Sequence, residues 1–194
     1  MKILVSGGTG LVGSEIVERL LPGVNGTQIT VGTRSPRSRA KTNSHVRFVR
    51  SDVNDSAALE AATEGQEVVI HCVQFPNHPI ENHWRNWTYM KVDGEGTVRL
   101  VAAAKKNGVR RFIYLSGAGA GRGRMETWFQ AKQMAENAIR DSGMEYVIFR
   151  PSWIYGPRDH SVNRFVLMSR FLPFLPVIGN GRTKVQPVYV GDVA

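Results

Sequence analysis

The sequence predicts an α/β fold in which a doubly wound parallel sheet is flanked by helices. Short apolar segments alternate with stretches of helical periodicity along the 194 residues, and this alternation is typical of repeated strand–helix–strand units. The first apolar segment is followed at once by a glycine-rich turn and a helical pattern. A chain of this length can bury roughly 70% of its unfolded surface in one domain.

The predicted elements follow one another in a regular order. We expect strands over residues 2–6, 28–33, 46–50, 67–72, 111–116, 145–150 and 184–190. We expect helices over residues 14–21, 56–64, 86–107 and 126–142. Gly108 is expected to stop the third helix, because glycine commonly follows the last helical residue. The connections 75–83 and 158–182 are longer than simple turns, so we expect ligand-contacting elements there.

The turn after the first strand has the sequence Ser-Gly-Gly-Thr-Gly-Leu-Val-Gly over residues 6–13. Its three glycines allow a sharp turn, a close approach of bare backbone to a diphosphate, and tight packing of the helix on the strand. The N–H groups of the first helical turn then face the anion. A glycine triplet alone is a weak signal, because any tight strand-to-helix turn favours glycine. The expected diphosphate site comprises Gly7, Thr9, Gly10, Leu11, Val12 and Gly13.

The net charge of +9 is unevenly distributed. Residues 34–50 contain six basic residues and no acidic residue. Such a block suits a nucleic-acid backbone, one small phosphorylated ligand, or simply a solvated basic face. We expect no nucleic-acid partner, because the chain contains no recognisable nucleic-acid-binding motif.

The end of the second strand is where a dinucleotide-binding fold recognises the adenosine ribose. An acidic residue there binds the 2′-hydroxyl of NAD, whereas an arginine favours the 2′-phosphate of NADP. This chain has Arg34 at that point, with Arg37 within reach. One charge-assisted hydrogen bond contributes about 1.5–3 kcal/mol, which is roughly 10- to 150-fold in affinity. The sequence therefore predicts NADP(H) in preference to NAD(H).

Further residues follow the third and fourth predicted strands. Asp52, with Val53 beside it, is expected to accept a hydrogen bond from the adenine amino group, although an acidic residue here can also simply cap a helix. We assign the capping role to Asp55. Cys72 and Val73 come at the end of the fourth strand, at the carboxyl edge of the sheet where ligands bind.

Other sequence features exclude several classes of protein. No apolar segment approaches the roughly 20 residues of a membrane-spanning helix. Cys72 is the single cysteine, so an internal disulfide is excluded and a reducing, cytoplasmic compartment is favoured. His78 and His83 are a poor pair for zinc, and no metal site is expected.

These motifs resemble the extended and atypical short-chain dehydrogenase/reductases, the epimerase/dehydratase-like group. The resemblance covers nearly the whole chain and implies a Rossmann fold that binds NAD(P). It rests on residues 6–13, Asp52-Val53, 108–116, Ala131-Lys132 and 150–157. Residues 163–173, 179–182 and 186–194 most resemble relatives of the nucleotide-binding accessory subunit of respiratory complex I.

The family's catalytic pattern is only partly present. The resemblance implies a serine that orients the substrate, a tyrosine that moves the proton, and a lysine four residues later that holds the nicotinamide ribose. Lys132 matches the lysine, but Trp128 stands at the tyrosine position, and an indole does not ionise near neutral pH. Gly117 stands at the serine position, with Ser116 one residue earlier. Pro151 begins a loop that in the family passes beside the nicotinamide.

Two functions are compatible with this departure. In the first, the protein is an atypical NADPH-dependent reductase or isomerase that acts on a small-molecule substrate, and Lys132, Tyr89 or Tyr155 supplies the proton. In the second, it binds NADP(H) without turnover, as a structural or redox-sensing protein, and Trp128 fills the reactive pocket. We favour the second. Each proton donor named in the first also has a structural alternative, in which Lys132 only holds the ribose and the tyrosines only pack.

We interpret residues 1–194 as a single NAD(P)-binding domain in which residues 151–194 begin a substrate-binding subdomain. Similar proteins continue further, so the subdomain is expected to be truncated. The apolar stretch 165–178 could line a substrate pocket, touch a membrane or partner, or join the core. If it is left partly uncovered, we expect a homo-oligomer or association with a larger complex.

Overall fold

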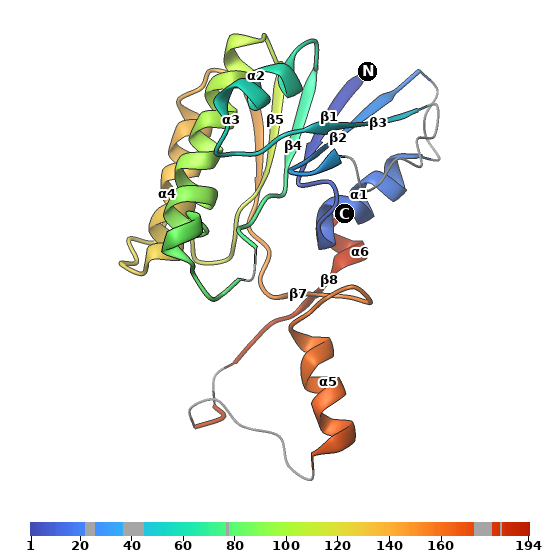
Figure 1. Cartoon of the computed structure of the whole chain (residues 1–194). Helices are drawn as coiled ribbons and strands as arrows, with labels where there is room; N and C mark the ends of the chain where they lie inside the picture. Colours follow the sequence, from blue (N-terminus) through green and yellow to red (C-terminus); the bar gives the residue numbers. More distant parts are fainter. Residues whose placement is uncertain (22–25, 37–44, 77, 173–179, 183) are drawn as a thin grey trace.

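The computed structural model describes residues 1–21, 26–36, 45–76, 78–172, 180–182 and 184–194. Six strands form one parallel sheet in the order β3-β2-β1-β4-β5-β6 (Figure 1). They are β1 (Lys2–Ser6), β2 (Gln28–Thr33), β3 (Val46–Arg50), β4 (Val68–His71), β5 (Arg111–Leu115) and β6 (Glu145–Phe149). The strand order reverses direction between β1 and β4, which is the point at which such sheets bind ligands.

Helices cover both faces of the sheet, which confirms the doubly wound arrangement. They include α1 (Leu11–Leu20), α2 (Ser56–Thr63), α3 (Gly96–Lys106) and α4 (Thr127–Arg140). Strand side chains alternate between faces, so Leu4 and Phe112 pack in one cluster with α2, α3 and α4. Ile3 and Val5 belong to a second cluster, against which α1 packs. Figure 1 shows α3 and α4 side by side on one face and α1 on the other.

Local caps decide where the helices begin and end. The first helix starts at Leu11 rather than at the predicted residue 14, because extended Gly10 is its N-cap. The Asp55 carboxylate accepts a hydrogen bond of 3.0 Å from the Ala58 N–H and caps α2, as predicted. Gly108, with φ of 71°, follows the end of α3 and confirms the predicted stop.

The predicted helix over residues 86–107 is divided into two helical segments, and a short turn lies before them. A 3-10 turn (η3, His83–Arg85) and a π-helical segment (η4, Tyr89–Glu95) precede α3. The Thr88 hydroxyl caps η4 by accepting a hydrogen bond from the Lys91 N–H. The wider π-helical turn is a departure that helical periodicity alone does not predict, and such segments often occur at functional sites.

The carboxyl-terminal part differs from the prediction. The seventh predicted strand, over residues 184–190, is absent from the main sheet. Its residues Val188–Tyr189 (β8) instead pair with Ile154–Tyr155 (β7) in a separate two-stranded sheet and lead into α6 (Val190–Val193). A further helix, α5 (Val162–Phe171), lies within the predicted long connection. Figure 1 shows α5 projecting away from the main sheet.

Several apolar side chains of α5 and β6 are exposed. The described part of the apolar stretch ends at Leu172, and Phe171 is 78% exposed. Val147 and Phe149 of β6 are also half-exposed, opposite Ile113 and Leu115 in the register of the sheet. Among the described helices, none is long and apolar enough to cross a bilayer.

The Gly13→Ala variant tests the close packing of α1 on the glycine turn. A Cβ at residue 13 would lie 2.3 Å from the Gly7 carbonyl oxygen. Alanine usually stabilises a helix relative to glycine by roughly 0.5–1 kcal/mol. Here we expect the free energy of unfolding to fall by roughly 1–3 kcal/mol, because the added methyl group forces a backbone shift.

Urea denaturation measures this change. Gly26→Ala is the comparison, because a Cβ there meets no atom within 4 Å and adds only the strain of a φ of 78°. A Gly13→Ala variant more stable than the wild type would contradict the close packing.

Candidate functional site

The glycine turn forms a cradle of backbone between β1 and α1. Gly7 has a φ of 79°, and a Cβ on it would lie 3.0 Å from the backbone of both Cys72 and Val73. The Gly10 N–H donates to the Gly7 carbonyl at 2.9 Å. No side chain caps α1, and its first turn contains no acidic residue. The positive end of the helix is therefore open to an anion.

The predicted cofactor residues follow the carboxyl ends of neighbouring strands. Arg34 follows β2, Asp52 follows β3, Cys72 follows β4, Ser116 follows β5 and Pro151 follows β6. Because parallel strands all end at the same edge, the fold gathers these positions along one side of the sheet. Arg37 lies outside the described residues.

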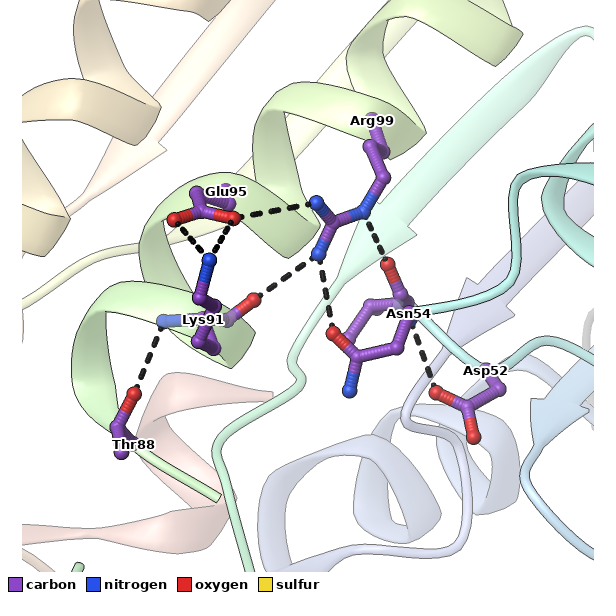
Figure 2. Close-up of polar contacts among 7 residues, drawn as sticks. Asp52, Asn54, Thr88, Lys91, Glu95 and Arg99 are labelled. Carbon is purple, nitrogen blue, oxygen red and sulfur yellow. Dashed lines mark hydrogen bonds and ion pairs between the residues drawn. The ribbon is translucent and has the colours of Figure 1, made fainter. Parts of the chain in front are cut away.

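The loop after β3 is held by an arginine that the sequence analysis did not identify. Arg99 Nε donates to the Val53 carbonyl at 2.8 Å, and its guanidinium also contacts the Asn54 side chain at 3.0 Å. The same guanidinium donates to the Lys91 carbonyl of η4 at 3.1 Å (Figure 2). Asp52 accepts a hydrogen bond of 2.9 Å from the Asn54 N–H, so its carboxylate also stabilises its own turn.

Lys132 lies in a buried ion pair. Its Nζ is 3.1 Å from Asp93 Oδ1, and both side chains are almost fully buried. Asp93 Oδ2 also accepts from the Phe75 N–H at 3.3 Å. Burial opposes the charge on Lys132, but Tyr114 and Asp93 outweigh it and raise the pKa of the amine. Lys132 is therefore an ammonium at neutral pH.

His71 is fully buried and pairs with Thr97. The Thr97 hydroxyl donates to the Asp93 carbonyl at 2.7 Å and lies 3.0 Å from His71 Nε2, an arrangement that favours a proton on Nε2. Nδ1 then carries no proton. Burial, helped by the charge of Lys132, lowers the pKa of His71 to about 3. Burial also raises the pKa of the Cys72 thiol to about 12.

Ser116 is directed toward a second buried charge. Its hydroxyl donates to Glu136 Oε1 at 2.7 Å, and Glu136 also accepts from Arg140 and Arg150. Burial would raise the pKa of Glu136, but the hydrogen bonds from Arg150, Ser116 and Arg140 outweigh it and hold the pKa at about 2. These contacts engage Ser116 within the protein.

Trp128 occupies the space beside Gly117. A Cβ on Gly117 would lie 2.4 Å from the Trp128 ring atom Cη2, so no larger residue fits while the indole keeps this position. Trp128 also contacts Phe129 edge to face at 4.6 Å. Glycine at residue 117 and tryptophan at residue 128 are therefore sterically matched.

The two candidate tyrosines lie in different surroundings. Tyr89 has its hydroxyl 2.8 Å from His78 Nδ1 and its ring against Phe75. Burial, reinforced by Asp93 and then Glu81, raises the pKa of Tyr89 to about 12. Tyr155 instead lies in β7, where its ring contacts Tyr189 at 5.8 Å. Within the described part of the chain, no three His, Cys, Asp or Glu residues are grouped to hold a metal ion.

Two cavities lie away from the glycine cradle. One of about 460 Å³ is at the amino ends of β1 and β2 and is lined by residues that include Lys2, Gln28 and Gln66. The other, of about 420 Å³, lies against α4 between Phe129 and Met134. Neither is lined by a residue predicted to bind the cofactor.

Some contacts around the candidate site could not be predicted from the sequence pattern. Lys91, Glu95 and Arg99 have the spacing of ion pairs on one helix face, and the pairs are present. The contact from Arg99 to Val53 spans 46 residues and has no such signal. Asp93 likewise became a candidate only when the fold placed it beside Lys132.

Comparison with known proteins identifies the family. Residues 7–170 match the NAD(P)H-binding family. The chain is 31% identical to the mitochondrial NADH dehydrogenase [ubiquinone] 1 alpha subcomplex subunit 9 of Arabidopsis thaliana, over 98% of this chain and 47% of that protein. It is 26% identical to a dTDP-glucose 4,6-dehydratase of Streptomyces niveus, over 99% of this chain and 66% of that protein.

A solved structure has the same fold. The dTDP-glucose 4,6-dehydratase DesIV of Streptomyces venezuelae, with NAD and DAU bound, superposes with a TM-score of 0.79 at 22% identity, over 100% of this chain and 69% of that one. The chain spans about half the length of the subunit 9 relatives that it matches.

The buried, neutral His71 predicts acid sensitivity. A depressed pKa in the folded state means that the contribution to stability is complete above about pH 6.5, the ordinary pKa, and is lost as the pH falls toward 3. We expect the free energy of unfolding to fall by about 2 kcal/mol from this group between pH 6.5 and pH 5.

Denaturant titrations at several pH values measure this loss. His71→Asn should lower stability overall but remove this part of the pH dependence, whereas His83→Asn, at an exposed position, should leave the slope unchanged. Equal slopes in the wild type and His71→Asn would refute the assignment.

Proposed function

The chain belongs to the NAD(P)H-binding family and has epimerase/dehydratase-like relatives, and from this premise we propose that it binds NADP(H) without turning it over. In this role it serves as a structural or redox-sensing protein. The relative named as a complex I subunit supports such a role.

The residues at the glycine turn fit a dinucleotide diphosphate. Gly7 and Gly13 lie so close to other backbone that any Cβ would collide, and the start of α1 has no side-chain cap and would attract an anion. Gly7, Thr9, Gly10, Leu11, Val12 and Gly13 would hold the diphosphate. Asp52 and Val53 would contact the adenine.

The remaining cofactor residues would hold the ribose and nicotinamide ends. Arg34 would bind the 2′-phosphate, because it is exposed and immediately follows β2. Lys132 would contact the nicotinamide ribose, with Cys72, Val73, Ser116 and Pro151 along the same edge. The bound dinucleotide would supply a hydride donor or acceptor.

The contact between Gly117 and Trp128 carries the proposal that turnover is absent. The indole fills the space that a side chain at residue 117 would need, and it has no proton to transfer near neutral pH. Ser116, the nearest hydroxyl in sequence, donates to Glu136. A substrate carbonyl would therefore contact neither the serine nor the tyrosine that the family's catalytic pattern supplies.

A reductase or isomerase is the second candidate function. It is favoured by the hydrogen bond between Tyr89 and His78, because a tyrosine paired with a histidine can pass a proton to a substrate. Lys132 would then be retained for catalysis, and Tyr155 would be the other hydroxyl available. The substrate would be a small carbonyl compound or a sugar-nucleotide-like molecule.

Association with other proteins is also part of the proposal. The half-exposed Val147 and Phe149 on β6 and the exposed Phe171 on α5 support a homo-oligomer or a place in a larger complex. We further propose a cytoplasmic location, with residues 151–194 beginning a substrate-binding subdomain.

Calorimetric titration tests the cofactor. We expect NADP⁺ to bind more tightly than NAD⁺, and Arg34→Gln to weaken NADP⁺ roughly 10- to 150-fold while leaving NAD⁺ nearly unchanged. In parallel, absorbance at the NADPH band should show no substrate-dependent oxidation across a panel of carbonyl compounds. Tighter binding of NAD⁺ would overturn the NADP(H) assignment, and turnover abolished by Lys132→Ala would favour the enzyme.

A double-mutant cycle tests the match between residues 117 and 128. Gly117→Ser alone should lower the free energy of unfolding by roughly 1–3 kcal/mol, because the new Cβ collides with the indole. Trp128→Tyr in the same chain should recover most of that loss, which thermal unfolding of the four proteins measures. A Gly117→Ser variant as stable as the wild type would contradict the conclusion that the Trp128 indole fills the space beside residue 117.

A further inference from the structure

Residues 82–87 form a closed loop between β4 and η4. The Asn82 N–H donates to the Trp87 carbonyl at 2.8 Å, and the Trp87 N–H donates back at 2.9 Å. The Asn82 side chain accepts from the Arg85 N–H at 3.1 Å. Two backbone hydrogen bonds and one side-chain hydrogen bond therefore hold Arg85 and Trp87 in a defined arrangement. The loop begins within the connection 75–83, which was predicted to contact a ligand.

Trp87 joins this loop to two arginines. Its half-buried ring packs against the core cluster that contains Val53. The Arg85 guanidinium lies 4.9 Å from the ring centroid, and the Arg34 guanidinium lies 5.6 Å from it. The Cζ atoms of Arg34 and Arg85 therefore lie near the same ring, at a separation no greater than the sum of these two distances. The two residues are 51 positions apart in the sequence. Cation–π attraction favours this gathering of two positive charges.

The two arginines are free to receive an anion. Both are exposed, and among the described residues neither forms a salt bridge, whereas Arg50 and Arg99 nearby in the fold each pair with a carboxylate. Two guanidiniums held on one indole repel each other, and an anion bound by both would offset that repulsion. A phosphate monoester with nearly two negative charges suits this position, because each guanidinium can donate two parallel hydrogen bonds to its oxygens.

We propose that Arg85, held by Trp87, is a second specificity-determining residue for the 2′-phosphate of NADP(H). This inference rests on the proposed function, since Arg34 marks the adenosine end of that site. Arg85 reaches the same phosphate from the loop between β4 and η4, and Trp87 serves as the platform that keeps both guanidiniums in place. The preference for NADP(H) is thereby divided between β2 and a segment far away in sequence.

Fluorescence and calorimetric titrations with NADP⁺, NAD⁺, 2′-AMP and 5′-AMP test this inference. Arg85→Gln should weaken NADP⁺ and 2′-AMP roughly 10- to 100-fold and leave NAD⁺ and 5′-AMP within about 2-fold. Arg34→Gln with Arg85→Gln should remove the preference for NADP⁺. Arg110→Gln, an equal charge change before β5 at the opposite edge of the sheet, should alter none of the four affinities.

Tryptophan variants give a readout that does not depend on affinity. The fluorescence change on adding 2′-AMP should be lost in Trp87→Phe and kept in Trp84→Phe, since Trp84 is 99% exposed. An Arg85→Gln variant that binds NADP⁺ as the wild type does, or that weakens NAD⁺ equally, overturns the role of Arg85 and leaves the proposed function intact. A wild-type protein that binds neither dinucleotide overturns both.

Discussion

The close contact between Gly7 and Gly13 is the constraint on which the site depends. Because neither residue has a side chain, the start of α1 lies directly against the turn after β1, and Gly7 also lies against the backbone at the end of β4. This contact aims the positive end of α1 along the carboxyl edge of the sheet. The other strands bring Arg34, Asp52 and Ser116 to the same edge only because all six are parallel.

Buried charges fix α4 against this edge. Lys132 pairs with Asp93 of η4, and Glu136 binds Ser116 and Arg150 at the ends of β5 and β6. Moving such charges out of water is costly, and loss of one partner of a fully buried pair such as Lys132–Asp93 typically costs about 3–5 kcal/mol. Arg150 is partly exposed, so its pair with Glu136 contributes less. These two pairs therefore hold α4 in one position relative to the sheet, and with it Lys132 and Trp128.

The groups around Lys132 keep one protonation state across the neutral range. His71 is neutral because burial, together with the charge of Lys132, lowers its pKa to about 3. Cys72 and Tyr89 keep their protons because burial raises the pKa of each to about 12. A general acid or base works best with a pKa near the working pH. None of these three groups therefore has a pKa near neutral, which supports the proposal that a cofactor is bound without turnover.

Local sequence determined the six strands of the main sheet, the glycine turn, the Asp55 cap and the stop at Gly108, because periodicity and backbone preference act over a few residues. The division of residues 86–107 and the short pairing of β7 with β8 departed from that pattern, since packing against other elements decided them. Only the tertiary structure placed Asp93 beside Lys132, Trp128 against Gly117, and Arg85 with Arg34 on Trp87. Each of these contacts depends on how a helix or loop is rotated against a distant strand, and no short-range pattern encodes that rotation.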